Sequence, residues 1–234
     1  MNTGKVLKES FLTIKGNLNL ITPPLIISLV IAIMSEAVII AEEGVNSAQG
    51  VGDDRQFYTK ILALIFINYI LQVFSQGMVI AMAEELLAKG HYSLKGGFYK
   101  TISKLNRLLV VSFIFAVLII VGIFLFIVPA IIVSFVFMYV FVIVMTEDIT
   151  SIESFKEGFR IVKVNLGASM LIYSSLAVTG LFFTILDVAL KDMEYEAIGF
   201  TISLFLLSAL VSFSGVVMLK AYKELKTLKS VKIL

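Results

Sequence analysis

The sequence contains no cysteine, one histidine and three prolines among its 234 residues. Without cysteine the chain forms no disulfide, no thiolate nucleophile and no cysteine-based metal site. The one histidine, His91, has no cluster of carboxylates beside it in the sequence, so we predict neither a metal nor a cofactor. These absences leave few nucleophile–base pairs, and we expect that the protein is not an enzyme.

Charged residues are also scarce, at 15% of the chain, whereas apolar residues make up 59%. An ordinary soluble domain is about 45–50% apolar. A soluble protein of this size could not bury so much apolar surface, so we expect a lipid bilayer to surround most of the chain. The net charge of +2 is small, which argues against nucleic acid as a partner and favours membrane lipids.

The apolar residues fall into long runs that predict transmembrane helices. Five runs stand out: Pro23–Ala41, Ile61–Met82, Leu108–Met145, Gly167–Leu190 and Ala197–Leu219. A helix needs about 20 apolar residues to cross a hydrocarbon core about 30 Å thick. The third run is about twice that length, so it must fold back, and Pro129 is the natural break. We predict spans at Leu108–Ile127 and Ala130–Met145, and an all-α integral membrane protein with six spans in a single domain, 1–234.

The N-terminal region also has features of a cleavable signal peptide, namely early lysines, an apolar stretch, and Ser35 and Ala37 at cleavage spacing. However, the basic leader is long, and the apolar sequence continues through Val38–Ala41. We therefore interpret this region as a retained first span.

The distribution of basic residues predicts the orientation, because lysine and arginine stay on the cytoplasmic side. With the N-terminus inside, the inner segments carry Lys5, Lys8, Lys15, Lys89, Lys95, Lys100, Lys104, Arg107, Lys156, Arg160, Lys163, Lys220, Lys223, Lys226, Lys229 and Lys232. Only Arg55, Lys60 and Lys191 fall outside. We predict a multi-pass protein of the cell membrane with both termini in the cytoplasm and a basic tail at 220–234.

Three basic segments precede the first, third and fifth spans, and their sequences resemble one another. LKESFLTIKGNL (7–18) and FKEGFRIVKVNL (155–166) agree at six positions without a gap, and LKGGFYKTISKL (94–105) aligns with the first. We predict a threefold internal repeat, each unit an amphipathic helix followed by a transmembrane hairpin, over about 4–82, 93–145 and 150–219. A repeat axis often marks a shared cavity.

The three amphipathic helices are expected to lie in the membrane interface, with their apolar faces in lipid and their cations on anionic headgroups. The candidate headgroup contacts are Lys8, Lys15, Lys95, Lys104, Lys156, Arg160 and Lys163. Thr22 and Pro23 predict a helix break before the first span, and Gly167 predicts one before the fifth. Thr150 and Glu153 predict a capping box at the start of the last amphipathic helix.

The run from Gly122 to Gly167, GIFLFIVPAIIVSFVFMYVFVIVMTEDITSIESFKEGFRIVKVNLG, carries a family likeness. The features are a Gly-to-Pro hairpin, an acidic residue, and an amphipathic helix, at Gly122, Pro129, Glu147, Phe155, Phe159, Lys163 and Asn165. The run resembles several poorly characterised prokaryotic six-span membrane families, including the membrane domain attached to some glycerophosphodiester phosphodiesterases. AKGHYSLKGGFYK (88–100) is similar to theirs as well. The resemblance implies six spans, and since the catalytic domain of those enzymes is absent here, it implies no activity.

Polar residues inside the predicted spans are the candidates for a functional site. Asn68, Gln72 and Gln76 recur every four residues and form a polar stripe on span two. The stripe either joins helices by hydrogen bonds or lines a hydrated path or ligand site. Glu36 is the one carboxylate well inside a span, and it serves either as a residue of the outer rim or as a proton or cation site.

These observations leave two main hypotheses for function. We expect a non-catalytic membrane protein that interacts with lipids or with partner membrane proteins, in an assembly or scaffold role and as a homo-oligomer. The alternative is a transporter or channel for a small solute or ion, using a polar path near Glu36, Asn68, Gln72 and Gln76.

Overall fold

The computed structural model describes the backbone of residues 1–49, 54–191 and 196–232, and side-chain surroundings for residues 1–36, 59, 63–190 and 198–227. Within this part of the chain the regular secondary structure is entirely helical. The elements are α1 (Thr3–Gly16), the 3₁₀ helix η1 (Leu18–Ile21), α2 (Thr22–Gln49), α3 (Asp54–Lys89), α4 (Leu94–Phe124), α5 (Ile127–Val136), α6 (Val140–Thr146), α7 (Ser151–Val164), α8 (Leu166–Lys191) and α9 (Glu196–Lys232). The predicted outer loops, residues 42–60 and 191–196, fall largely outside the described side chains.

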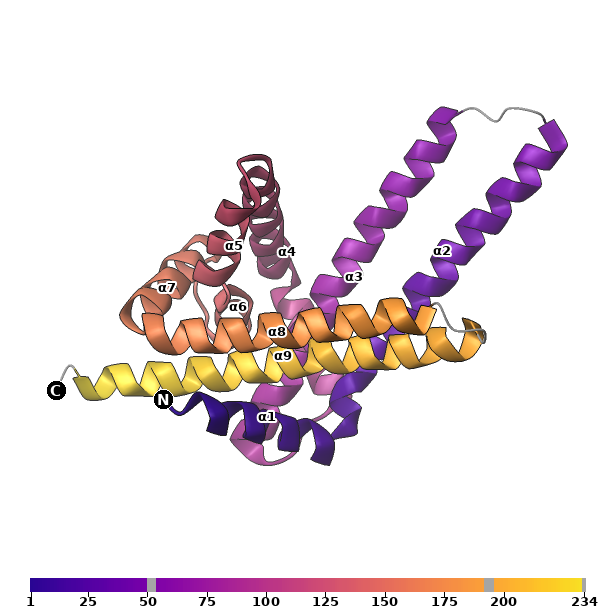
Figure 1. The fold of residues 1–234 in the computed structure, drawn as a ribbon. Helices are drawn as coiled ribbons and strands as arrows, with labels where there is room; N and C mark the ends of the chain where they lie inside the picture. Colours follow the sequence, from indigo (N-terminus) through magenta and orange to yellow (C-terminus); the bar gives the residue numbers. More distant parts are fainter. Residues whose placement is uncertain (50–53, 192–195, 233–234) are drawn as a thin grey trace.

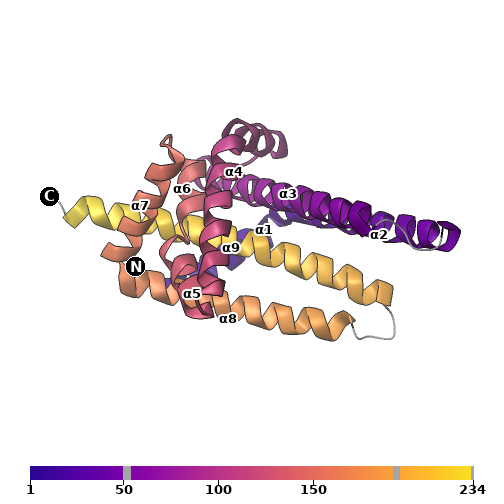
Figure 2. The same ribbon diagram turned by 90° about the horizontal axis from the view of Figure 1, so that it is seen from above.

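Six stretches of the described chain are long and apolar enough to cross a membrane, which confirms an all-α multi-pass architecture. They pair as three hairpins: α2 with α3, α4 with α5 and α6, and α8 with α9. The hairpins leave a shared base in different directions (Figure 1), and the view from above in Figure 2 separates the α2–α3 pair from the α8–α9 pair.

The buried core lies at this base, which is the region where the three hairpins meet. One end of the second helix of each hairpin forms most of it. Its central segments are Met78–Ala83 of α3, Val142–Met145 of α6 and, in α9, the buried residues of Val216–Leu225. The far halves of the hairpins instead present large apolar side chains to the outside, as at Ile65 and Leu181. Such faces are stable only against lipid or another apolar partner. Packing between the helices of the chain is therefore concentrated at the base.

The three basic segments dock around the base in a ring. The beginning of α4 packs on α3, α7 packs on α6, and α1 packs on α9, so each segment contacts the second helix of the hairpin before it, and the first segment closes on the last hairpin. Two bonds fix that closure: Ser212 of α9 donates to the Leu20 carbonyl at 2.9 Å, and Lys220 donates to the Thr13 hydroxyl at 2.8 Å.

The long third apolar run folds back as predicted, but its turn lies at Leu125–Phe126, three residues before Pro129. Phe126 adopts a positive φ of 82°, which reverses the chain. Pro129 is the third residue of α5, where a missing backbone N–H costs no hydrogen bond because the first turn has no partner for it. The arms meet closely because Gly122 has no side chain: a Cβ there would lie 2.7 Å from the Ala130 nitrogen.

The fourth span is interrupted. α5 ends at Val136 and α6 begins at Val140, so the candidate span Ile127–Thr146 contains a turn near its middle. Irregular backbone at membrane depth is stable where it is buried in protein or lines a cavity. Here Met138 and Tyr139 are buried, and the turn faces the cavity described below.

Two of the three predicted amphipathic helices are separate elements, and the third is not. α1 and α7 end at Asn17 and Asn165, whose side-chain amides donate to the carbonyls of Thr13 at 2.9 Å and Ile161 at 3.1 Å. The break before span five is therefore at Asn165 and not at Gly167. The middle segment continues into the third span as one helix, α4, and the basic segment after residue 220 likewise continues α9.

Candidate functional site

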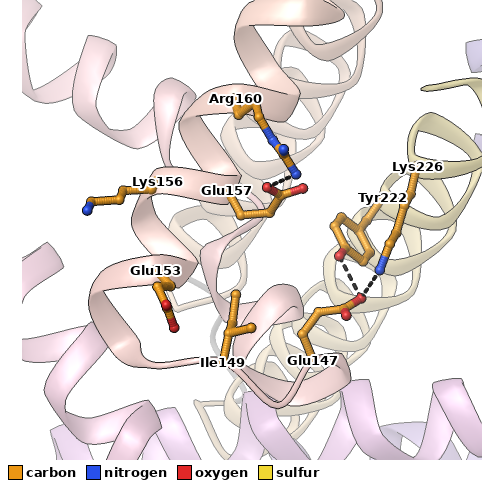
Figure 3. A pocket seen from close by; sticks show the side chains of 8 residues that line it. All are labelled: Glu147, Ile149, Glu153, Lys156, Glu157, Arg160, Tyr222 and Lys226. Atoms are coloured by element: carbon orange, nitrogen blue, oxygen red, sulfur yellow. Dashed lines mark hydrogen bonds and ion pairs between the residues drawn. The ribbon is translucent and has the colours of Figure 1, made fainter. Parts of the chain in front are cut away.

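The C-terminal end of the interrupted span is linked to α9 by a carboxylate. Glu147 follows α6 and accepts hydrogen bonds from the Tyr222 hydroxyl at 2.8 Å and from the Lys226 ammonium (Figure 3). Burial raises the pKa of the Glu147 carboxyl, but the bonds from Lys226 and Tyr222 outweigh burial and hold that pKa below its usual range. Glu147 is therefore a charged link between the second and third hairpins at neutral pH.

The next residue links the same corner to α4. Lys104 lies 3.1 Å from the Asp148 carboxylate and donates to the Glu147 carbonyl at 3.0 Å, while Arg107 donates to the Ile149 carbonyl at 3.4 Å. The hydrogen bond from Lys104 lowers the pKa of Asp148. The side chain of Lys104 is only 12% exposed, so this cation stabilises the α6–α7 corner and does not lie at the surface, where a headgroup contact needs it.

The start of α7 has the predicted capping box. The Thr150 hydroxyl accepts from the Glu153 backbone N–H at 3.3 Å, and Glu153 accepts from the Thr150 N–H at 2.8 Å. The bond from the Thr150 backbone, and then that from its hydroxyl, lowers the pKa of Glu153. The cap fixes the angle at which α7 leaves α6.

These elements enclose a polar pocket of about 460 Å³ beside the base. Its charged lining consists of Glu147, Glu153, Glu157, Lys156, Arg160 and Lys226. Glu157 pairs with Arg160 one turn away, and Lys156 is directed away from the other side chains (Figure 3). Because the charges balance and most are already paired, the pocket is better suited to hold the α6–α7 corner on α9 than to bind an ion.

A second surface feature is an apolar groove between α2, α3 and the start of α4, with a volume of about 420 Å³. Ile26, Phe74 and Phe98 line it, and the two rings meet edge to face with centroids 5.4 Å apart. Lys95 and the Thr22 hydroxyl belong to the same lining. The groove thus combines apolar walls with one exposed cation.

The structure does not bring the four predicted polar-path residues together. Gln76 is exposed and lines a partly open cavity of about 310 Å³ among the hairpins. Asn68 and Gln72 are half-buried and do not line this cavity, and Glu36 is exposed on α2. The stripe is therefore divided: its last member faces a cavity, and the other two lie earlier in α3 and do not.

The same cavity contains polar residues that the sequence did not single out. Ser134 of α5 and Tyr173 of α8 form a hydrogen bond of 2.5 Å, and Ser214 of α9 lines the wall near them. They lie on three different helices, so no periodicity connects any one of them to the other two. Only the fold of the three hairpins brings them together.

The candidate headgroup cations also divide. Five of these seven cations are exposed and have no ion-pair partner within the described part of the chain: Lys8, Lys15, Lys95, Lys156 and Lys163. Arg160 is exposed but paired with Glu157, and Lys104 is enclosed as described above. Five of the seven predicted cations are thus available to the membrane surface.

Comparison with known proteins adds no relative: no protein-family model, no curated protein and no solved structure matches this chain.

Proposed function

We propose that this protein is a non-catalytic, lipid-interacting membrane protein whose three basic segments bind anionic phospholipids of the cytoplasmic leaflet. The observation that carries the proposal is a pattern of burial shared by the three segments. Ser10, Gly97 and Gly158 occupy equivalent positions and are all buried against the base.

The neighbouring position is exposed in all three segments. Phe11, Phe98 and Phe159 are 60%, 42% and 48% exposed. Each segment thus turns a small residue to the protein and a phenylalanine outward, beside lysines that have no partner within the described residues. An outward aromatic flanked by cations is the arrangement by which amphipathic helices enter the headgroup region. The common pattern also supports the threefold repeat as a proposal.

The groove beside Lys95 fits the same ligand. Its apolar walls match an acyl chain, and the ammonium of Lys95 matches a phosphate at the chain's polar end. A basic residue near an anionic membrane surface contributes about 1 kcal/mol. The exposed lysines together are therefore sufficient to select anionic over zwitterionic lipid.

The test is lipid binding to the whole protein in nanodiscs, measured by native mass spectrometry with phosphatidylglycerol and phosphatidylcholine. A triple variant, Lys95→Gln, Lys156→Gln and Lys163→Gln, removes three unpaired cations. We expect its preference for phosphatidylglycerol to fall by about tenfold or more, since each cation contributes about 1 kcal/mol.

The matched control also removes three positive charges, but from cations engaged with carboxylates: Lys5→Gln, Lys89→Gln and Lys100→Gln. This control should keep most of the preference. Equal losses in the two variants would mean that net charge alone attracts the lipid, and no preference in the wild type would exclude the proposal.

A second function, transport of a small solute, is favoured by one specific observation. Discontinuous spans next to a cavity occur in transporters, where the freed backbone groups face the substrate. Here the turn at 137–139 adjoins the cavity that Gln76 lines. Liposomes loaded with a pH-sensitive dye, or with a potassium-sensitive one, would detect a proton or potassium flux. A flux that Gln76→Leu changes and Gln72→Leu does not would support transport. If neither a proton flux nor a potassium flux appears, transport is excluded for these ions and lipid binding remains the proposed function.

A further inference from the structure

The cavity that Gln76 lines is where all three hairpins converge. α3 contributes Gln76, α4 contributes Phe115, α5 contributes Ser134, α6 contributes Phe141, and α8 and α9 contribute Tyr173 and Ser214. Its volume of about 310 Å³ is at the small end of the range for ligand pockets, about 300–1,000 Å³. Its position in five of the spans places it within the membrane-spanning part of the molecule.

The lining contains no charged side chain. Phenylalanine, methionine and aliphatic side chains make up most of the wall, and the polar groups are an amide and three hydroxyls. A charged ligand would lose its hydration here without gaining a counter-ion. The chemistry of the cavity therefore selects a neutral ligand that is mostly apolar.

The hydroxyls show where such a ligand would form a hydrogen bond. Ser134 donates to the Ile131 carbonyl at 2.9 Å, so in the short bond between Ser134 and Tyr173 the tyrosine is the donor. The Tyr173 oxygen thus keeps its acceptor capacity on the cavity side. Ser214 likewise donates to the Val211 carbonyl and remains able to accept.

Gln76 supplies the donor. Its side-chain amide forms no hydrogen bond with the described residues, although it lies in a membrane span. An amide without a partner in an apolar environment costs several kcal/mol, so a bound molecule that pairs with it is stabilised by that interaction. Amide and phenol together suit a ligand with one hydroxyl group, whose oxygen accepts from Gln76 and whose proton is donated to the Tyr173 oxygen.

The cavity opens toward the lipid and is closed toward the base. Ala177 lines it and is exposed on α8, next to Val178 at 66% exposure. On the other side lie the turn residue Tyr139 and, one turn beyond the cavity in α9, Tyr222, both fully buried with ring centroids 6.5 Å apart. A ligand therefore enters from the bilayer.

We infer that this cavity binds a neutral, lipid-like amphiphile with a single hydroxyl group, such as a long-chain alcohol. The polar end pairs with Gln76 and Tyr173, the adjoining carbons contact Phe115 and Phe141, and the remainder of the chain leaves beside Ala177 into the lipid. The site is independent of the basic segments, so removal of their lysines leaves it intact.

The probes for the test are a long-chain alcohol that carries a photoreactive diazirine and the alkane of equal length with the same diazirine. The whole protein in nanodiscs is irradiated with each probe, and labelled residues are mapped by mass spectrometry. We expect the alcohol to label cavity residues of α5, α6 and α8 above the outer faces of the hairpins, and the alkane to label both alike.

Two substitutions with matched controls complete the test. Ala177→Trp should block the entrance and reduce cavity labelling several-fold, whereas Ala189→Trp, at an exposed position further along α8, should leave it unchanged. Gln76→Leu should reduce labelling by about fivefold through the lost hydrogen bond, and Gln72→Leu should not.

Retention of the wild-type thermal midpoint shows that each variant is folded. If the alcohol labels the cavity no more than the outer faces, or if Ala177→Trp and Ala189→Trp give equal labelling, the inference is overturned. The phosphatidylglycerol preference of the wild type is measured separately, so failure here is distinct from failure of the proposed lipid-binding function.

Discussion

The base of the molecule and the far halves of its hairpins contain the same types of apolar residue in different surroundings. At the base, Leu108, Met145 and Leu219 are fully buried in protein. In the far halves, Phe113 and Leu181 are each 65% exposed, and Ile65 is 58% exposed. Apolarity therefore predicts that a residue avoids water, but it does not predict whether protein or lipid surrounds it.

Polar residues make the same distinction. The described ion pairs lie at or beside the base, where Glu147, Asp148 and Glu84 pair with Lys226, Lys104 and Lys100. These three pairs each join two different segments of the chain. The base is thus held by packing and by charges, whereas the far halves depend on the bilayer, and the predictions below test that contrast.

The largest effect is expected from a cavity cut into the base. Leu108→Ala removes a fully buried side chain and should lower the free energy of unfolding by about 3 kcal/mol. Leu181→Ala makes the same chemical change on a lipid-facing surface and should cost less than about 1 kcal/mol. Thermal unfolding in detergent measures both, and equal shifts would contradict the contrast.

Overpacking tests the same contrast from the opposite direction. A Cβ at Gly77 would lie 2.7 Å from the Thr101 side chain and 2.9 Å from Leu108, whereas one at Gly180 meets nothing within 4 Å. Gly77→Val should destabilise by about 2 kcal/mol, and Gly180→Val by much less. A thermal midpoint for Gly77→Val equal to that of Gly180→Val would show that α3 and α4 are not so closely packed.

The charged link at Glu147 should give the base a pH dependence. Because the folded pKa of Glu147 lies below the unfolded value of about 4.3, its stabilisation is fully present above that value. The stabilisation is lost as the pH falls through the folded pKa. Glu147→Gln should cost about 1 kcal/mol at pH 7 and flatten the decline in stability on acidification.

Asp148 and Glu153 also have lowered pKa values, so part of the decline should remain in the Glu147 variant. The control is Glu9→Gln, which changes an exposed carboxylate on α1 and should leave the acid profile unchanged. An unaltered profile in Glu147→Gln would mean that the link contributes nothing.

An effect no larger than that of Glu147→Gln is expected at the capping box. Thr150→Ala removes the acceptor for the Glu153 N–H and should cost about 1 kcal/mol. Thr184→Ala, on the exposed surface of α8, removes only a bond to its own helix at Gly180 and is the matched control. A Thr150→Ala midpoint no lower than that of Thr184→Ala would show that the cap does not stabilise α7.

Much of this fold was predictable because a bilayer imposes strong constraints on sequence. Span number and the doubled third run followed from length alone, and the box at Thr150 and Glu153 followed from local chemistry. The position of the turn at Phe126 was not predictable, because proline is tolerated both in a turn and in the first turn of the helix that follows it. Similarly, the continuity of α4 was hidden because Leu94–Leu105 has the same periodicity whether or not the helix stops.

The candidate sites were less predictable, since they depend on contacts between distant segments. Gln76 was already a candidate from the sequence. Ser134, Tyr173 and Tyr222 were not, because they lie on three different helices and no local pattern connects them. Lys104 was expected at the membrane surface because a basic residue on an amphipathic helix normally faces outward. Only the position of Asp148, 44 residues later, explains why it faces inward.

The central claim is that the first basic segment closes a ring on the last hairpin at the base, on the side that the sequence predicts to be cytoplasmic. One cross-linking measurement tests it most directly. The chain has no cysteine, so Thr13→Cys and Lys220→Cys introduce a unique pair. A short, membrane-impermeant bis-maleimide should join them in inverted vesicles, which expose the cytoplasmic face, and should not react in intact cells. Reaction in intact cells, or modification of both cysteines in inverted vesicles without a cross-link, would contradict the account.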